Sequence, residues 1–161
     1  MGMSTTKNTA ARFQPLFSSA TDEWPTPRWL FDALHAEFRF SLDPCATGAN
    51  AKCARFFTRE EDGLNQSWEN ETVFMNPPYG RTIGLWMGKA FEASRAGSTV
   101  VCLVPARTDS RWWHSFAMRG EIRLLQGRLR FEGGKHSAPF PSAIVVFRPV
   151  PIRLSSMQRP G

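Results

Sequence analysis

The chain has 161 residues, enough for one domain with a sizeable core, and its 42% hydrophobic and 21% charged residues are typical of globular proteins. No apolar run approaches the roughly 18 residues of a membrane span, and the N-terminus lacks an apolar signal core. Three cysteines without a Cys-x-x-Cys pair and three scattered histidines argue against a disulfide framework and a metal site. We therefore expect a cytoplasmic protein without metal.

The positive charge is unevenly distributed along the chain. The net charge is +6, and from residue 100 onward ten Lys or Arg stand against three acidic residues, an excess of seven. A basic segment of this kind favours a polyanionic partner, although a solvated basic surface gives the same pattern.

The first half of the chain predicts one helix and two strands. Residues 1–20 are polar and lack periodicity, which predicts a flexible tail. Apolar residues at helical spacing then follow Pro27 as far as Phe38. Residues 40–42 read as a short strand and 72–75 as a second, with loop and short helix between them.

The second half predicts further alternation of helices and strands. Residues 85–95 have helical periodicity, and the apolar run 99–104 is typical of a strand buried on both faces. Asp109 or Ser110 can cap a short helix, and residues 122–125 read as a strand.

The C-terminal part predicts a strand pair, 129–131 with 143–147, around a loop rich in Gly and Pro. Strands alternating with helices indicate an α/β fold whose sheet is parallel at first. The antiparallel C-terminal strand pair makes this a mixed sheet. We expect a single domain over residues 21–150, followed by a flexible tail over 151–161.

Two polar groups held by prolines follow predicted strands: Asp43-Pro44-Cys45-Ala46 and Asn76-Pro77-Pro78-Tyr79. In open α/β sheets, ligands bind beyond the carboxyl ends of the strands, so both segments are expected at one site. Prolines fix φ and remove backbone donors, which leaves the Asn76 side-chain oxygen and the Pro77 carbonyl as acceptors. Two acceptors suit an amino group, and Tyr79 offers a flat face on which a base can stack.

The ordered motifs resemble the phage-type DNA N6-adenine methyltransferase family. The resemblance spans about residues 22–148, in order and without large gaps. The motifs that carry it are Asp22-Glu23-Trp24-x-Thr26-Pro27, Leu42-Asp43-Pro44-Cys45-Ala46, Asp62-Gly63-Leu64 with Trp68, Asn76-Pro77-Pro78-Tyr79-Gly80, Leu103-Val104-Pro105-Ala106-Arg107-Thr108-Asp109, Gly127-Arg128-Leu129-x-Phe131 and Ala138-Pro139-Phe140-Pro141-Ser142. It implies a compact Rossmann-like methyltransferase fold that uses S-adenosylmethionine, DNA as partner, and a phage or prophage gene expressed in a bacterial cell.

The resemblance also implies roles for single residues. Asn76, Pro77, Pro78 and Tyr79 would form the catalytic loop that holds a flipped adenine. The cofactor would contact Thr26, Asp43, Pro44, Cys45 and Asp62, together with Asn76. The family's larger relatives carry a Gly-rich loop after the first strand, which this sequence lacks. The ribose-binding acid is therefore not identified, and Glu60 and Glu61 are weak candidates.

Four residues are predicted to contact DNA. Arg107 and Asp109 follow a strand end on the ligand side of the sheet, and Arg128 and Arg130 alternate on a predicted strand, where both can reach phosphates. Each isolated residue also has a structural interpretation: Asp43 and Asp62 as turn residues, Thr26 as a helix cap.

The sequence therefore predicts methyl transfer from S-adenosylmethionine to the N6 amine of adenine in DNA. The alternatives are the N4 amine of cytosine, a glutamine amide in a protein, or a DNA-binding protein that has lost catalysis. The sequence does not reveal the recognition site, the strandedness of the DNA or the oligomeric state.

Overall fold

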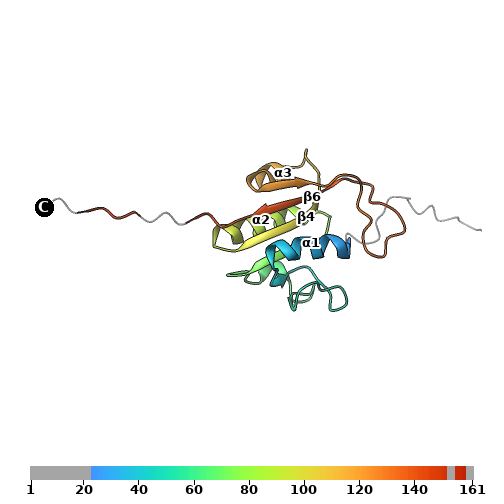
Figure 1. Ribbon diagram of the computed structural model, residues 1–161, viewed down its shortest axis with the longest axis horizontal. Coiled ribbons are helices and arrows are strands. Elements are labelled where there is room, and N and C mark those ends of the chain that lie inside the picture. The colour runs from blue at the N-terminus through green and yellow to red at the C-terminus, as the bar shows by residue number, and fades with distance from the viewer. Residues whose placement is uncertain (1–22, 152–154, 159–161) are drawn as a thin grey trace, which may run out of the picture.

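The structure is a computed structural model that describes residues 23–151 and 155–158. The predicted tail 1–20 lies outside the described residues, as do 152–154 and 159–161 of the predicted C-terminal tail. The predicted domain boundaries therefore stay predictions. The described residues form a sheet with helices on its two faces (Figure 1).

Within the described ranges, six strands form one sheet in the order β2-β1-β3-β4-β6-β5. Strands β2, β1, β3 and β4 run parallel to one another, and β6 runs antiparallel to both β4 and β5. The predicted α/β class and mixed sheet are confirmed. The strands are β1 (Leu42–Asp43), β2 (Arg55–Phe56), β3 (Thr72–Met75), β4 (Thr99–Pro105), β5 (Glu121–Leu124) and β6 (Ser142–Phe147).

The two longest strands of the sheet are β4 and β6, which pair from Val100 opposite Phe147 to Pro105 opposite Ser142. Nearly every residue of both strands is buried, as expected for strands covered by helices on both faces. Their β-branched side chains fill the space between these helices and the sheet.

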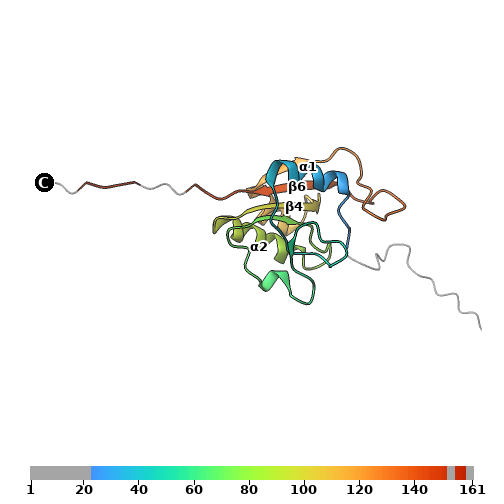
Figure 2. The ribbon, with the colours of Figure 1, turned by 60° about the horizontal axis from the view of Figure 1, so that its bottom comes forward.

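Helix α1 (Arg28–Phe38) covers one face of the sheet and α2 (Ile83–Arg95) the other (Figure 2). The Phe31 ring of α1 meets the Phe74 ring of β3 edge-on at 5.2 Å between centroids. The short helix α3 (Arg111–Ser115) packs beside α2, as does the following turn through Phe116 and Phe91. The helices expected after Pro27 and over 85–95 are confirmed.

The prediction of a strand at 129–131 is wrong. These residues lie in a loop, and the strand that pairs with β6 at this edge of the sheet is β5. Leu129 and Phe131 are buried, which explains their strand-like alternation. Their neighbourhood forms loop hydrogen bonds: the Leu129 carbonyl accepts from Ala138 N at 2.7 Å, and Glu132 N donates to the Pro25 carbonyl at 2.9 Å. The two-residue strand β2 lies in a region predicted as loop and helix, because two residues carry no periodicity.

Candidate active site

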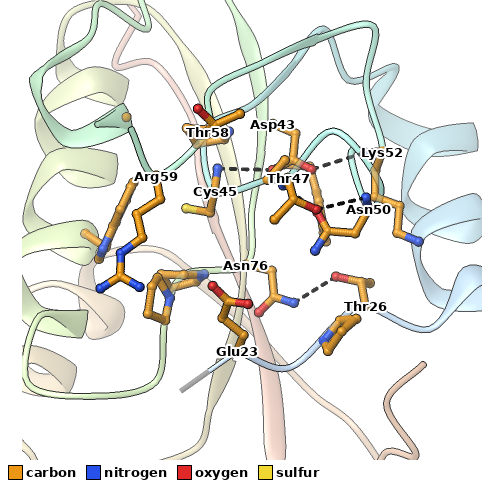
Figure 3. A pocket seen from close by; sticks show the side chains of 18 of the residues that line it. Glu23, Thr26, Asp43, Cys45, Thr47, Asn50, Lys52, Thr58, Arg59 and Asn76 are labelled. Carbon is orange, nitrogen blue, oxygen red and sulfur yellow. Dashed lines mark hydrogen bonds between the residues drawn. The ribbon is translucent and has the colours of Figure 1, made fainter. Parts of the chain in front are cut away.

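A cavity of about 700 Å³ opens at the carboxyl ends of β1 and β3 (Figure 3). These strands are parallel neighbours, and the chain leaves β1 toward β2 on one side and reaches β3 on the other. Ligands of open α/β sheets bind at this kind of switch point, and the volume is typical of small-molecule sites. Most of the lining comes from four segments: 23–26, 43–52, 58–64 and 76–78.

The Asn76 amide lies in this cavity, directly after β3 (Figure 3). Its nitrogen donates to the Trp24 carbonyl at 2.6 Å and to the Thr26 hydroxyl at 2.9 Å. Its Oδ1 atom is buried and has no hydrogen-bond partner among the described residues. A buried polar atom without a partner is costly, so an orphan oxygen in a cavity indicates a place for a donor from a ligand.

The prolines after Asn76 shape the same part of the lining. Pro77 is buried and Pro78 half-buried, and both line the cavity. In the described loops, no backbone N–H is bonded to the Pro77 carbonyl. Both acceptors expected from the sequence, Asn76 Oδ1 and the Pro77 carbonyl, therefore have no donor within residues 23–151 and 155–158.

Tyr79 lies outside this lining and is only 4% exposed. Its hydroxyl donates to the Leu103 carbonyl at 2.9 Å, and its ring meets Phe131 and Phe140 edge-on. Burial raises the pKa of the Tyr79 phenol well above its usual range. The predicted stacking of a base on Tyr79 is not possible in this conformation and requires the aromatic side chains to move.

Asp43 ends β1 and organises the loop behind it. Its Oδ1 accepts from Cys45 N and its Oδ2 from Lys52 N, both at 3.2 Å. Burial raises the pKa of the Asp43 carboxyl, while these two backbone donors oppose that rise. Asp43 lines the cavity, but both of its oxygens already serve the loop 44–52, which we call the β1 loop.

The β1 loop stands where larger methyltransferases carry glycines. Thr47 and Asn50 exchange backbone-to-side-chain hydrogen bonds at 2.7 and 3.2 Å, which closes the turn. Pro44 and Cys45 of this loop line the cavity, as predicted from the sequence.

A close backbone contact fixes the β1 loop against the next segment. A Cβ atom on Gly63 would lie 2.2 Å from the Pro44 carbonyl oxygen, so only glycine fits there. The Trp68 indole N–H donates to the Gly63 carbonyl at 2.9 Å and holds the 3₁₀ turn Gly63–Asn65. Asp62 precedes this turn, lines the cavity and accepts from the Asn65 side chain.

Glu60 and Glu61, the weak ribose candidates, lie outside the lining. Glu61 instead accepts from the Thr58 backbone at 2.8 Å. The structure brings Thr58 and Arg59 to the cavity at this position, directly after β2. The two residues of β2 carry no periodic pattern, so the sequence alone does not predict a site at the end of this strand.

The charges in the lining favour a cation. Its carboxylates are Glu23, Asp43 and Asp62, and its cationic side chains are Lys52 and Arg59. The Lys52 ammonium is already paired with the Glu132 carboxylate at 2.8 Å. A negative cavity in a chain of net charge +6 is therefore matched to a positively charged ligand.

The four predicted DNA contacts lie at the same edge of the sheet as the cavity. Arg107 and Asp109 follow β4, while Arg128 and Arg130 lie in the loop 125–141 that leads into β6. Ala106 N donates to the Pro141 carbonyl at 2.8 Å, which joins the two segments. All four predicted side chains are exposed, and none lines the cavity.

Part of the basic C-terminal third has a structural role instead. Arg123 bonds both Glu37 oxygens at 2.7 and 2.8 Å and also reaches Glu121, which pairs with Arg148. This network ties α1 to β5 and β6. Arg123 thereby lowers the pKa of Glu37 and Glu121.

Among the described residues, no helix is long and apolar enough to span a membrane. In the same part of the chain, no group of three or more His, Cys, Asp or Glu side chains is arranged to hold a metal ion.

Comparison with known proteins gives the family. The DNA N-6-adenine-methyltransferase of Escherichia phage T1 is 31% identical over 94 residues, 57% of this chain but only 39% of the phage protein. The protein named "Putative methyltransferase YfdM" from Escherichia coli (strain K12) is 37% identical over 65 residues, 36% of this chain and 71% of YfdM. The family model described as DNA N-6-adenine-methyltransferase (Dam) matches residues 15–157. Because that match covers most of the chain, the protein belongs to the DNA N-6-adenine-methyltransferase (Dam) family.

Proposed function

We propose that the protein transfers a methyl group from S-adenosylmethionine to the N6 amine of adenine in DNA, after the base has left the helix stack. The family supports this reaction. The observation that carries it here is the buried Asn76 Oδ1, which has no partner among the described residues while its amide nitrogen is held by Trp24 and Thr26.

The cavity suits S-adenosylmethionine in size and charge. When bound, this cofactor supplies a methyl group on a positively charged sulfonium. Its sulfonium and ammonium outweigh its single carboxylate, so its net positive charge matches the excess of acids in the lining. Candidate contacts are Pro44, Cys45 and Asp62, of which Asp62 offers an exposed carboxylate. Asp43 and Thr26 also line the cavity, but the Asp43 oxygens are bonded to the β1 loop and the Thr26 hydroxyl to Asn76.

Two acceptors of adjacent residues in the lining would explain how the chain activates the amine. The adenine amino group is a poor nucleophile because its lone pair is delocalised into the ring. Asn76 Oδ1 and the Pro77 carbonyl would accept its two hydrogens and stabilise the positive charge that grows on nitrogen during transfer. Holding the amine in line with the methyl group contributes about 7–11 kcal/mol in well-oriented reactions.

The exposed basic side chains at the cavity edge would position the DNA. Arg128 and Arg130 are candidates for phosphate contacts, and Arg107 with Asp109 for contacts near the target base. Phosphate contacts of this kind supply affinity that is largely independent of sequence.

Product analysis tests the proposal. Plasmid DNA incubated with the pure protein and S-adenosylmethionine is digested to nucleosides, which are identified by mass. N6-methyl-2′-deoxyadenosine is the expected product, with heat-denatured protein as the control. N4-methyl-2′-deoxycytidine alone would reassign the acceptor, and no modified nucleoside together with no calorimetric binding of the cofactor would indicate a binding protein.

A further inference from the structure

Asn76 can serve as an acceptor only if its amide faces the right way. The oxygen and nitrogen of an amide are nearly equal in size, so packing alone does not select the orientation. Here the Trp24 carbonyl lies 2.6 Å from one end of the amide, and a carbonyl can only accept a hydrogen bond. The nitrogen must therefore point to Trp24, and Oδ1 is left for a ligand.

The Thr26 hydroxyl is the second group on this nitrogen, at 2.9 Å. Thr26 is 3% exposed, and its β-branched side chain has few rotamers. Two acceptors, from residues 24 and 26, thus hold the two hydrogens of one amino group. Figure 3 shows the bond to Thr26.

The segment that carries both acceptors is itself fixed. The Pro25 carbonyl accepts from Glu132 N at 2.9 Å, and the Trp24 ring packs against Phe131 and Phe140 at 5.2 and 5.1 Å. On the other side, the Pro27 carbonyl accepts from the Leu30 and Phe31 amides in the first turn of α1, both at 3.1 Å. The segment is therefore held at both ends and can impose an orientation on Asn76.

The Trp24 carbonyl selects the orientation of the Asn76 amide, and we infer that Thr26 is a positioning residue, whose hydroxyl holds the amide in that orientation with Oδ1 toward the substrate amine. The inference rests on the proposed function. It differs from the cofactor contact that the sequence predicts for Thr26, because the hydroxyl acts through Asn76. Loss of the hydroxyl leaves the Trp24 carbonyl as the remaining fixed partner of the amide.

Thr26→Val replaces the hydroxyl by a methyl group, and Thr26→Ser retains it. We expect Thr26→Val to lower kcat roughly tenfold, the effect of about one hydrogen bond, with the Kd of S-adenosylmethionine within twofold of the unchanged protein. Thr26→Ser should keep kcat within about threefold. In an Asn76→Ala background, Thr26→Val should cause little further loss, because the group that it orients is gone.

Three outcomes overturn the inference. They are an unchanged kcat in Thr26→Val, a weaker cofactor Kd with kcat retained at saturation, and an equal loss in the Asn76→Ala background. All three require an active unchanged protein, so they differ from failure of the proposed function, in which that protein makes no N6-methyl-2′-deoxyadenosine.

A measurement without turnover checks the contact directly. In ¹⁵N spectra, the Asn76 side-chain NH₂ signal, assigned by its loss in Asn76→Asp, should exchange slowly with solvent in the unchanged protein and in Thr26→Ser. Faster exchange is expected in Thr26→Val. Equal exchange in all three proteins would contradict the inference.

Discussion

The carboxyl ends of β1 and β3 look alike in sequence, since each carries a polar residue followed by proline, yet their hydrogen bonds differ. At β1, both Asp43 oxygens accept backbone N–H groups of the β1 loop. At β3, the Asn76 nitrogen is bonded twice while its oxygen is left without a partner among the described residues. Both oxygens of the Asp43 carboxylate are thus hydrogen-bonded within its own loop. Of the Asn76 amide, only the nitrogen is hydrogen-bonded to described residues.

This difference separates a residue that maintains the structure of the cavity from a residue that can bind a ligand. A saturated carboxylate has little capacity left for a ligand and instead maintains the shape of the cavity. A half-satisfied amide is held in place and still has an atom to offer. Substitutions at the two strand ends should therefore affect different measurements.

The largest effect is expected at β3. Asn76→Ala removes the orphan acceptor and should lower kcat by roughly 100-fold or more, as removal of one preorganised polar group from an active site does. The cofactor Kd should change less than twofold. Single-turnover methyl transfer and calorimetry measure the two quantities, with the exposed α2 substitution Glu92→Gln as control. A large loss of cofactor binding would contradict the division of roles.

At β1, stability and cofactor binding should respond together. Asp43→Asn presents an NH₂ group to one of two backbone donors, which leaves a buried N–H unpaired at a cost of about 1–3 kcal/mol. Thermal denaturation and cofactor titration should both show the loss. Asp32→Asn, which alters an exposed ion pair on α1, is the control. Unchanged melting and cofactor affinity would remove the distinction between the two strand ends.

Substitution of Arg128 and Arg130, at the edge of the cavity, should affect DNA binding alone. Arg128→Ala with Arg130→Ala is expected to weaken DNA binding and to reduce the slope of log K against log salt by about 2, one for each lost phosphate contact. Arg39→Ala with Arg95→Ala removes equal charge at the opposite edge, before β1 and β4, and should change the slope less. Equal slopes for the two double variants would refute the assignment of phosphate contacts to Arg128 and Arg130.

The smallest effect concerns thiol reactivity in and beside the β1 loop. Burial raises the pKa of Cys53 to about 12 and also raises the pKa of Cys45. Alkylation requires the thiolate, so both should react slowly at pH 8 and faster as the pH rises toward 12. Mass spectrometry after iodoacetamide treatment measures this, with guanidinium-denatured protein as the reactive control. Rapid labelling of the folded protein would show that the β1 loop opens.

The sequence predicted those features that depend on local pattern. The helices after Pro27 and over 85–95, the strands 72–75 and 99–104, and the position of Asn76 at a strand end all follow from periodicity and proline placement. The family resemblance was confirmed by the family match.

Features that depend on residues far apart in the chain could not be predicted from the sequence. The orientation of Asn76 is set by Trp24 and Thr26, about fifty residues earlier in the chain. Tyr79 is buried because the Leu103 carbonyl and two phenylalanines receive it. Neither fact leaves a pattern in the neighbouring residues.

Glu132 joins two parts of the molecule through separate groups: its backbone bonds Pro25, and its carboxylate pairs with Lys52. The exposed residues 133–137 lie between this anchor and the buried Ala138. A change at the exposed Lys135 or His136 should therefore leave both contacts of Glu132 in place. Replacing the Glu132 side chain would instead release the Lys52 ammonium at the end of the β1 loop, while the backbone bond to Pro25 would stay.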